Sequence, residues 1–387
     1  MRRTAPLSLA MIALLGLSAC GSGDTGAGGS LQGEGSGADC TIPGPVPVGA
    51  ALSLTGAAGS YGESQRNGLE LAAAHLNEQG GVTYELTVED DQTDERQGIT
   101  LFEQFTDDGV SAIIGPTLST TAFQAQPIAQ DAGVPVVAIS NTADGITEQG
   151  EYIHRVSLTE GQVIPQTVAA VTESEDLENV VVMYSDDDAF TESGYEVFAQ
   201  ALEDEGVEVA ETLTFSVADT DFRPLLTEAA KAEPDAVIVS ALIEAAIPLV
   251  TQAREIGLDV PIVGGNGFNN PQLMTDAGEA AEGVVVGAAW NSAATQNELN
   301  TDFLAAYEAE YGKAPDQFAA QAYTGLMTID AAVRAECSGE PEAIKDGLGT
   351  IDGLDTVLGS LTINDARDAE HEAVVQVVTD GEFVALD

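Results

Sequence analysis

Residues 236–256 read AVIVSALIEAAIPLVTQAREI, and this stretch decides the fold. Its first four residues are all apolar, a pattern typical of a parallel strand that is covered by helices on both faces of a sheet. We therefore predict a strand over Ala236–Ser240. After a short turn, apolar residues recur at helical spacing and predict an amphipathic helix over Ala245–Ile256. The stretch is thus one strand–turn–helix unit of an α/β protein.

The same unit recurs along the chain, and past Arg155 the cycle starts again. Because residues 41–387 are more than one core usually holds, we predict two lobes, each a doubly wound parallel sheet. The other predicted strands are Val46–Leu54, Tyr84–Glu89, Ala112–Gly115, Pro135–Ile139, Val180–Tyr184, Glu208–Thr214 and Pro261–Gly264, and the other predicted helices are Gly62–Asn77, Glu95–Asp107, Thr120–Ala132, Glu160–Thr172, Glu192–Glu205 and Phe222–Ala232.

The chain is expected to cross between the lobes three times, near Val156, Ala288 and Leu358. Residues 41–156 plus 288–357 then form lobe 1, and residues 157–287 plus 358–387 form lobe 2. Three crossings make a hinge, which allows one lobe to close on a molecule that the other lobe holds.

The first residues have the layout of a secretory signal, with Arg2 and Arg3 before an apolar run over Ala5–Leu17. The run is too short to span a bilayer. The tetrapeptide Leu17-Ser-Ala-Cys20 resembles the bacterial lipobox, whose Cys thiol receives a diacylglycerol. We predict a signal peptide over 1–19, and over 20–40 a lipidated Cys20 with a flexible Gly/Ser-rich tether. The protein is then extracytoplasmic and anchored to the cell membrane by lipid. The alternative is an ordinary signal peptide with Cys20 as a bystander.

The formal net charge is −52, from 64 acidic and 12 basic residues. This charge excludes nucleic acid as a partner. Because the acids are spread along the whole chain, they favour a solvated acidic surface, for which a saline habitat is one explanation. Steering of a cationic ligand is the alternative.

With Cys20 lipidated, Cys40 and Cys337 remain as the other two cysteines of a protein in an oxidising compartment. Disulfides persist in such compartments, so we predict that the two are bonded. The alternative is two separate buried thiols, because the sequence does not show how close the two Cα atoms lie.

Three loops that follow predicted strands of lobe 1 are rich in glycine and hydroxyl groups. In open α/β sheets, small molecules bind at the carboxyl ends of the strands. The loop at 55–62 contains Tyr61, the loop at 115–121 contains Ser119 at a helix start, and the loop at 140–143 contains Ser140 and Thr142. Hydroxyl groups, free N–H groups and a helix dipole favour a carboxylate there without any cation.

The chain from about Val46 to its C-terminus resembles the leucine/isoleucine/valine-binding proteins of ABC importers. The resemblance is carried by ALSLTG at 51–56 with Tyr61-Gly62, by IIGP at 113–116 with Ser119, and by Ser140-Asn-Thr142. It implies the type I periplasmic binding protein fold. It also implies a monomer without cofactor or metal, which closes on a branched-chain or other small amino acid and delivers it to the permease.

The resemblance also implies roles for the loop residues. The ligand carboxylate is held by Ser119, Ser140 and Thr142, and Tyr61 contacts the ligand. The alternative for Ser119 or Thr142 is a helix N-cap without a binding role.

Lobe 2 departs from the family pattern at three positions that we assign to the site. Phe190 replaces a tyrosine, Leu242 stands where an aromatic residue is common, and Asn266 stands where the family has its ammonium-binding glutamate. An amide oxygen binds an ammonium more weakly than a carboxylate does. Either Asp188 or Glu244 supplies the missing charge, or the ligand is an amide, a urea-like compound or an aromatic or aliphatic acid.

An enzyme and a ligand sensor are the two alternative classes of protein. Against an enzyme, the three histidines lie far apart, and the sequence contains no nucleophile elbow and no P-loop. The run Asp186-Asp-Asp188 is interpreted as a solvated turn before a helix, and a cation site is the alternative. A sensor that reports the ligand to a separate partner is the other alternative to import.

Overall fold

The computed structural model describes residues 30–294 and 297–386. The leader, Cys20 and the first part of the predicted tether lie outside these residues, and what the sequence predicts for them stays a prediction. Within the described ranges, no helix is both long and apolar enough to cross a bilayer.

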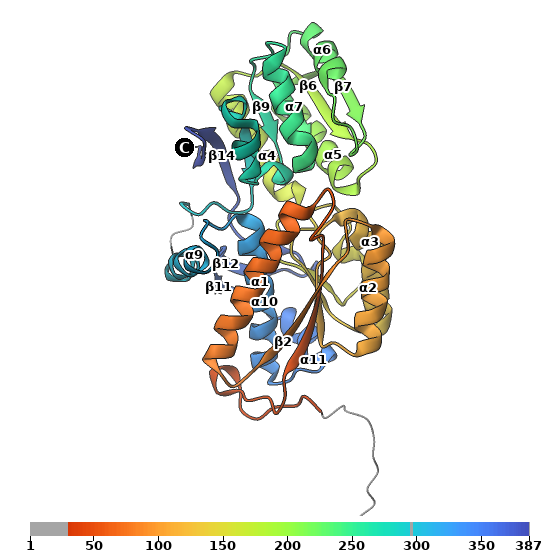
Figure 1. The fold of residues 1–387 in the computed structure, drawn as a ribbon, viewed down its shortest axis with the longest axis vertical. Helices are drawn as coiled ribbons and strands as arrows, with labels where there is room; N and C mark the ends of the chain where they lie inside the picture. The colour runs from red at the N-terminus through yellow and green to blue at the C-terminus, as the bar shows by residue number, and fades with distance from the viewer. Residues whose placement is uncertain (1–29, 295–296, 387) are drawn as a thin grey trace, which may run out of the picture. The chain divides into compact units, whose positions relative to one another are not determined.

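The first sheet is parallel and contains β1 to β5 in the order β2-β1-β3-β4-β5. Its helices α1 and α10 pack on one face, and α2 and α3 pack on the other (Figure 1). The strands are β1 (Val46–Leu52), β2 (Tyr84–Asp90), β3 (Ala112–Ile114), β4 (Val136–Ala138) and β5 (Ile153–Arg155), and the helices are α1 (Gly59–Gln79), α2 (Glu95–Asp108), α3 (Ser119–Ala132), α9 (Glu298–Tyr311), α10 (Gln317–Glu336) and α11 (Pro341–Leu348).

The second sheet has the order β15-β14-β10-β9-β8-β6-β7. Strands β6 to β10 are parallel, whereas β14 and β15 add an antiparallel edge that the sequence did not predict. The strands are β6 (Asn179–Ser185), β7 (Glu208–Phe215), β8 (Ala236–Ser240), β9 (Ile262–Gly264), β10 (Val285–Ala288), β14 (Val374–Thr379) and β15 (Glu382–Ala385), and the helices are α4 (Glu160–Glu175), α5 (Ala189–Glu205), α6 (Arg223–Lys231), α7 (Ile243–Glu255) and α8 (Gln272–Ala277).

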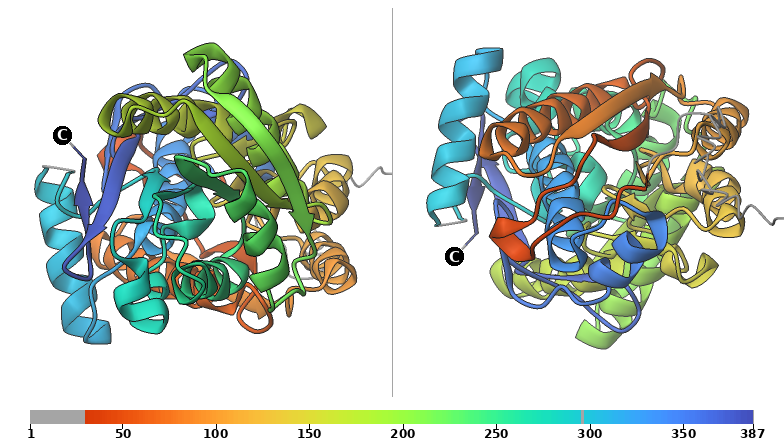
Figure 2. Two further views of the ribbon diagram at one scale, coloured as in Figure 1. Left: turned by 90° about the horizontal axis from the view of Figure 1, so that it is seen from above. Right: turned by 90° about the horizontal axis from the view of Figure 1, so that it is seen from below.

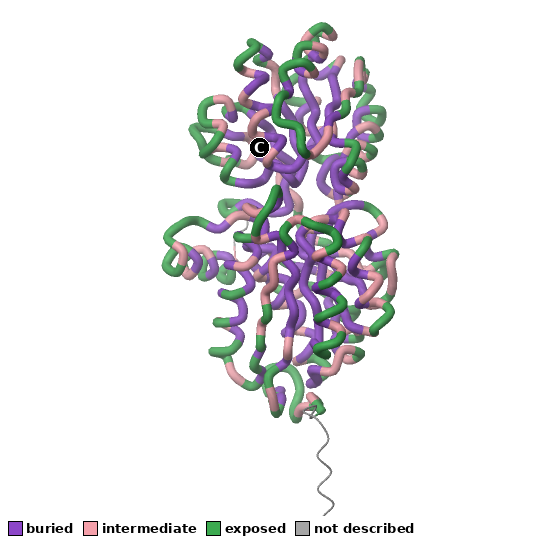
Figure 3. Tube along the Cα trace, turned by 45° about the vertical axis from the view of Figure 1, so that its right-hand side comes forward, coloured by how far each residue is buried: buried purple, intermediate pink, exposed green. Residues whose placement is uncertain are grey.

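The apolar run in β8 is buried on both faces, as its sequence pattern predicts. Val237 and Val239 pack into one hydrophobic cluster, and Ala236 and Ile238 pack into the cluster on the opposite face. Figure 3 shows the consequence along the trace, since the central strands of both sheets are buried while the helices expose one side. Successive strand residues point to opposite faces, so only a continuously apolar run satisfies both clusters.

The third passage of the chain differs from the predicted crossing near Leu358. The small antiparallel sheet of β11 (Leu354–Thr356), β12 (Gly359–Ile363) and β13 (Ala369–Glu370) packs on the core of the first sheet, through Leu361 among others. The chain reaches the second sheet only with β14, after Glu370. A short strand of ordinary composition gives no sign in the sequence of which core it joins.

The segment before β1 is docked on the first lobe rather than flexible throughout. Leu31 N donates to Glu340 Oε1 at 2.7 Å, and Gly33 N donates to the Cys337 carbonyl at 2.8 Å. Cys40 and Cys337 are joined by a disulfide with their Cα atoms 5.4 Å apart. In the right-hand view of Figure 2 this segment, in red, lies beside the blue helices α10 and α11. Hydrogen bonds and the disulfide therefore hold residues 31–40 against the first lobe, although their composition is typical of a flexible coil.

Helices α1 and α10 approach each other closely at one glycine. A Cβ atom on Gly68 would lie 2.2 Å from the carbonyl oxygen of Ala319. No side chain fits at that distance, so Gly68 permits the contact between the two helices.

Candidate ligand-binding site

The loops at the carboxyl ends of both sheets surround a cavity, as expected for a small-molecule site of an open α/β sheet. All seven residues that the sequence predicts for the site line this cavity: Tyr61, Ser119, Ser140, Thr142, Phe190, Leu242 and Asn266. Six further lining residues were missed: Thr117, Leu118, Gly267, Gln317, Phe318 and Gln321.

Ser119 and Thr142 lie in the cavity wall without capping a helix. Ser119 is the first residue of α3, and the cap position before it belongs to Leu118, which makes no side-chain cap. No helix begins at Thr142, and its buried hydroxyl lies beside the carboxyl group of Glu160, whose pKa it lowers by hydrogen bonding. The N-cap alternative is therefore wrong for both residues. Leu118 and Ser119, at the start of α3, both line the cavity, and the first N–H groups of a helix have no acceptor within it.

The Ser140 hydroxyl is already engaged within the protein. It donates to the Thr117 carbonyl at 2.7 Å and accepts from Gln65 Nε2 at 2.7 Å. Thr117 Oγ1 in turn donates to Gln65 Oε1 at 2.7 Å and accepts from the Ser53 backbone N–H. Ser140 thus fixes the second and third loops relative to each other, and its hydroxyl hydrogen is not available to a ligand.

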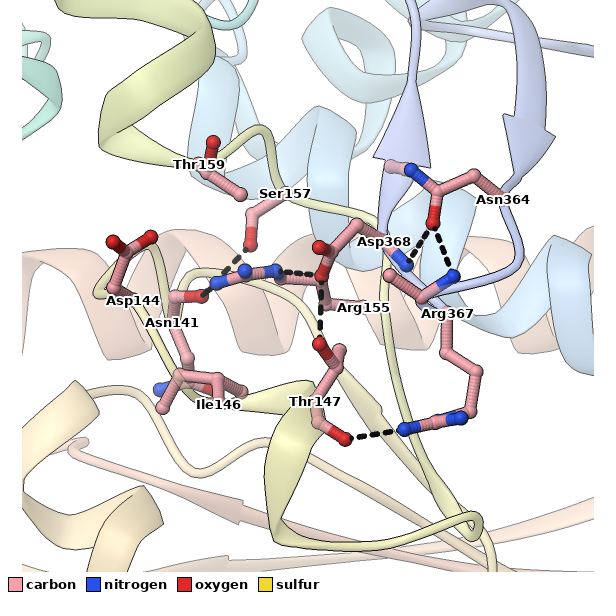
Figure 4. A network of polar contacts seen from close by, with 12 residues as sticks. Asn141, Asp144, Ile146, Thr147, Arg155, Ser157, Thr159, Asn364, Arg367 and Asp368 are labelled. Carbon is pink, nitrogen blue, oxygen red and sulfur yellow. Dashed lines mark hydrogen bonds and ion pairs between the residues drawn. The ribbon is translucent and has the colours of Figure 1, made fainter.

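A buried arginine supports the third loop (Figure 4). Arg155 Nη1 donates to the carbonyls of Asn141 and Ala143 at 3.0 and 2.8 Å, while its Nε contacts Asp368 Oδ1 at 2.6 Å. Asp368 also accepts from the Thr147 hydroxyl at 3.0 Å. Arg155 is 2 % exposed and does not line the cavity. It holds the loop backbone from outside the site, so the positive charge itself does not reach a ligand.

Aromatic and aliphatic side chains form the apolar part of the wall. The rings of Tyr61 and Phe318 lie 4.5 Å apart, and Leu118, Phe190 and Leu242 add further apolar surface. The Tyr61 hydroxyl donates to the Gly267 carbonyl and accepts from Ile243 N, both at 2.7 Å. Burial raises the pKa of this phenol well above its ordinary value. Tyr61 therefore presents its ring to the cavity, while its hydroxyl joins α1 to loops of the second sheet.

Other hydrogen bonds across the cavity join the two lobes at its rim. Thr120 Oγ1 donates to Asp188 Oδ2 at 2.7 Å and accepts from Ala189 N at 2.9 Å. On the opposite side, Asn270 Nδ2 donates to Ser60 Oγ at 3.2 Å. These contacts close the cavity.

Three lining residues contribute buried oxygen atoms. Among the described residues, Asn266 Oδ1 and Gln321 Oε1 lack any hydrogen bond, and Thr142 Oγ1 lies beside the Glu160 carboxyl. The cavity lining, as far as the structure describes it, contains no lysine or arginine. The site therefore offers acceptors to a ligand at one end and backbone N–H groups of α3 at another.

A carboxyl group that sequence reasoning missed lies behind Asn266. Asn266 Nδ2 donates to Glu160 Oε1 at 2.9 Å, and Glu160 is buried at the start of α4. Burial raises the pKa of Glu160 to about 6, which the hydrogen bond from Asn266 partly counteracts. Glu160 sits five residues after Arg155 at the crossing between lobes, and only that position hints at a role.

The two acids that the sequence suggested as a replacement charge do not line the cavity. Asp188 caps α5 through the Thr191 N–H and accepts from Thr120, so both of its oxygens are occupied. Asp187 accepts from Ser216 and Val217, which makes the acidic run a turn-and-cap structure. Burial raises the pKa of Glu244 to about 7. In the described part of the chain, no cluster of His, Cys, Asp or Glu is arranged to hold a metal ion.

Comparison with known proteins gives consistent matches over almost the whole folded chain. A family model described as periplasmic binding protein matches residues 45–382. A leucine-, isoleucine-, valine-, threonine- and alanine-binding protein of Pseudomonas aeruginosa is 26 % identical over 330 residues, which cover 84 % of this chain and 87 % of the relative.

Two solved structures show the same fold. A leucine-binding protein from Thermotoga maritima has a TM-score of 0.84 at 23 % identity and covers 88 % of this chain and 98 % of its own. A solute-binding protein of an ABC transporter from R. palustris, in complex with benzoate, has a TM-score of 0.82 at 23 % identity. The match covers 89 % of this chain and 96 % of the other.

Proposed function

Because the chain belongs to the periplasmic binding protein family, we propose that it is the extracytoplasmic substrate-binding component of an ABC importer. Its cargo on this proposal is a branched-chain or other small amino acid, which it delivers to the permease. The single observation that carries the proposal is the cavity where the loops of both sheets meet, lined by all seven predicted residues.

The cavity chemistry supports an amino acid with an apolar side chain. The start of α3 beside Ser119 provides N–H groups and the positive end of a helix dipole, which favour a carboxylate. Phe190, Leu242 and Phe318 provide apolar surface for the side chain. An enzymatic role has no comparable support.

Delivery requires that the loaded and empty forms differ. The hydrogen bonds from Tyr61 to Gly267 and from Thr120 to Asp188 form only when the lobes meet. A ligand that binds between the lobes shifts the population toward this closed form. We propose that the permease distinguishes the closed surface from the open one.

Membrane attachment through Cys20 is part of the proposal. It stands on the charged start, the apolar run and the Leu17–Cys20 motif of the sequence. Mass spectrometry of the mature N-terminus tests it, since an unmodified Cys20 would contradict attachment.

A second candidate cargo is an aromatic or aliphatic acid, an amide or a urea-like compound. It is favoured by Asn266, which provides no carboxylate for an ammonium, and by the relative that was solved with benzoate. A sensor with the same ligand chemistry would differ only in its partner.

Thermal shift of the mature protein against amino acids, amides and aromatic acids separates the candidates, because a ligand that binds only the folded state raises the melting temperature. Replacing both Ser119 and Thr142 by Ala should abolish the shift without unfolding the protein. The exposed Ser174→Ala variant, on the outer side of α4, is the matched control and should bind normally. Unchanged affinity in the double variant would place the site elsewhere.

A further inference from the structure

We infer that Glu160, acting through Asn266, makes the cavity prefer ligands with an ammonium group. A ligand of the same carbon skeleton that lacks the ammonium group should bind more weakly. The inference rests on the proposed function and names the ligand class. Glu160 is a positioning residue, because Asn266 rather than Glu160 lines the cavity.

The hydrogen bond between the two side chains fixes which end of the amide faces the ligand. An ionised carboxylate accepts hydrogen bonds but donates none. Asn266 must therefore turn its NH₂ group toward Glu160, where Nδ2 and Oε1 lie 2.9 Å apart. Its Oδ1 is left buried and without a partner in the described structure. Asn266 thus presents an acceptor to the cavity and cannot present a donor.

Two more acceptors line the same cavity from other elements. Thr142 Oγ1 comes from the third loop of the first sheet, and Gln321 Oε1 comes from α10. Gln321 Oε1, like Asn266 Oδ1, is buried and has no partner among the described residues. The Thr142 hydroxyl lies beside Glu160 and lowers the pKa of that carboxyl by hydrogen bonding, so its hydrogen points to Glu160 and its lone pairs remain as acceptors. Buried acceptors are costly when they stay unpaired, and an ammonium brings three N–H donors on one atom.

The charge of Glu160 is only partly balanced within the protein. No ion pair joins Glu160 to a described lysine, arginine or histidine. The guanidinium of Arg155, which is bound to Asp368 and to loop carbonyls, lowers the pKa of Glu160 less than burial raises it. A buried carboxylate is stabilised by a nearby positive charge. The pKa of Glu160, raised to about 6 by burial, agrees with a carboxyl that lacks this charge when the site is empty. A bound ammonium would supply it, with the polarised amide of Asn266 between the two charges.

Glu244 is the natural rival, and it serves as the matched control. It is also a poorly exposed carboxyl near the site, and its Oε2 is buried without a partner in the described structure. However, in the described structure no hydrogen bond joins its carboxylate to a lining residue, so it does not orient an acceptor toward the ligand.

The experiment measures the ratio of two affinities in the mature protein by calorimetry. The probes are L-leucine and 4-methylpentanoate, which differ only in the ammonium group. The wild type should prefer L-leucine, and Glu160→Gln should lower this preference by about tenfold, because a glutamine keeps an acceptor but loses the charge and the enforced amide orientation. Glu160→Asp should retain most of the preference, and Glu244→Gln should leave it unchanged.

If Glu160 had only a structural role, Glu160→Gln would lower the affinities for both probes equally. The ratio of the two affinities would then stay unchanged, and this result would overturn the inference. An altered ratio in Glu244→Gln instead of Glu160→Gln would overturn it as well. Should Glu160→Gln fail to fold, Asn266→Ala must show the same loss of preference. A wild type that binds 4-methylpentanoate as well as L-leucine contradicts only the inference, whereas a wild type that binds no amino acid contradicts the proposed function.

Discussion

At the scale of single residues, Glu160 links the site to the pH dependence of stability. Its pKa rises from an ordinary 4.5 to about 6 on folding, so the native state binds the proton more tightly than the unfolded state does. The carboxyl therefore destabilises the protein above about pH 6, and this penalty disappears as the pH falls toward 4.5.

Comparison of the wild type with Glu160→Gln isolates that effect. Between pH 7 and pH 4.5, the wild type should gain about 2 kcal/mol of unfolding free energy relative to the variant. Urea unfolding of both proteins without ligand, at several pH values, measures the difference. A difference that does not vary with pH would mean that the folded-state pKa of Glu160 is not raised.

At the scale of elements, the contact between α1 and α10 depends on Gly68. Gly68→Ala places a Cβ against the Ala319 backbone, which must move, and we expect a loss of about 1–3 kcal/mol of stability. Thermal unfolding measures this loss. Gly161→Ala in α4 is the control, because a Cβ there would lie at an ordinary contact distance of 3.6 Å from Thr159 Oγ1. If the two variants were equally stable, the packing of α1 against α10 would not depend on the absence of a side chain at Gly68.

The elements also show what the sequence could predict. Strands β6 and β8 of the second sheet follow from local apolar runs such as the one that begins at Ala236, and the loops of the site follow from strand ends, whereas β10, β14 and β15 were not predicted. The partner of Asn266 does not, because Glu160 lies 106 residues away and only the fold brings them together. The position of Leu31 likewise depends on a distant residue, Glu340. The same holds for β12, whose Leu361 packs into the core of the first sheet.

At the scale of the whole molecule, the disulfide between Cys40 and Cys337 joins residues 297 positions apart. Closing so long a loop restricts the unfolded chain, so we expect Cys40→Ser with Cys337→Ser to lose about 2–5 kcal/mol of stability. Neither cysteine lines the cavity, and ligand affinity should not change. Thermal unfolding of this variant and of the reduced wild type measures the loss. A fall in affinity at a temperature where the variant is folded would contradict the separation of bridge and site.

The position of that disulfide has a mechanical consequence. A protein held to a membrane by its first residues transmits any pull through the chain that enters the fold. Here the covalent bridge at Cys40 passes such a pull directly into the end of α10, before it reaches β1. On the proposed attachment through Cys20, strand β1, which leads into the first loop of the site, would not carry this force.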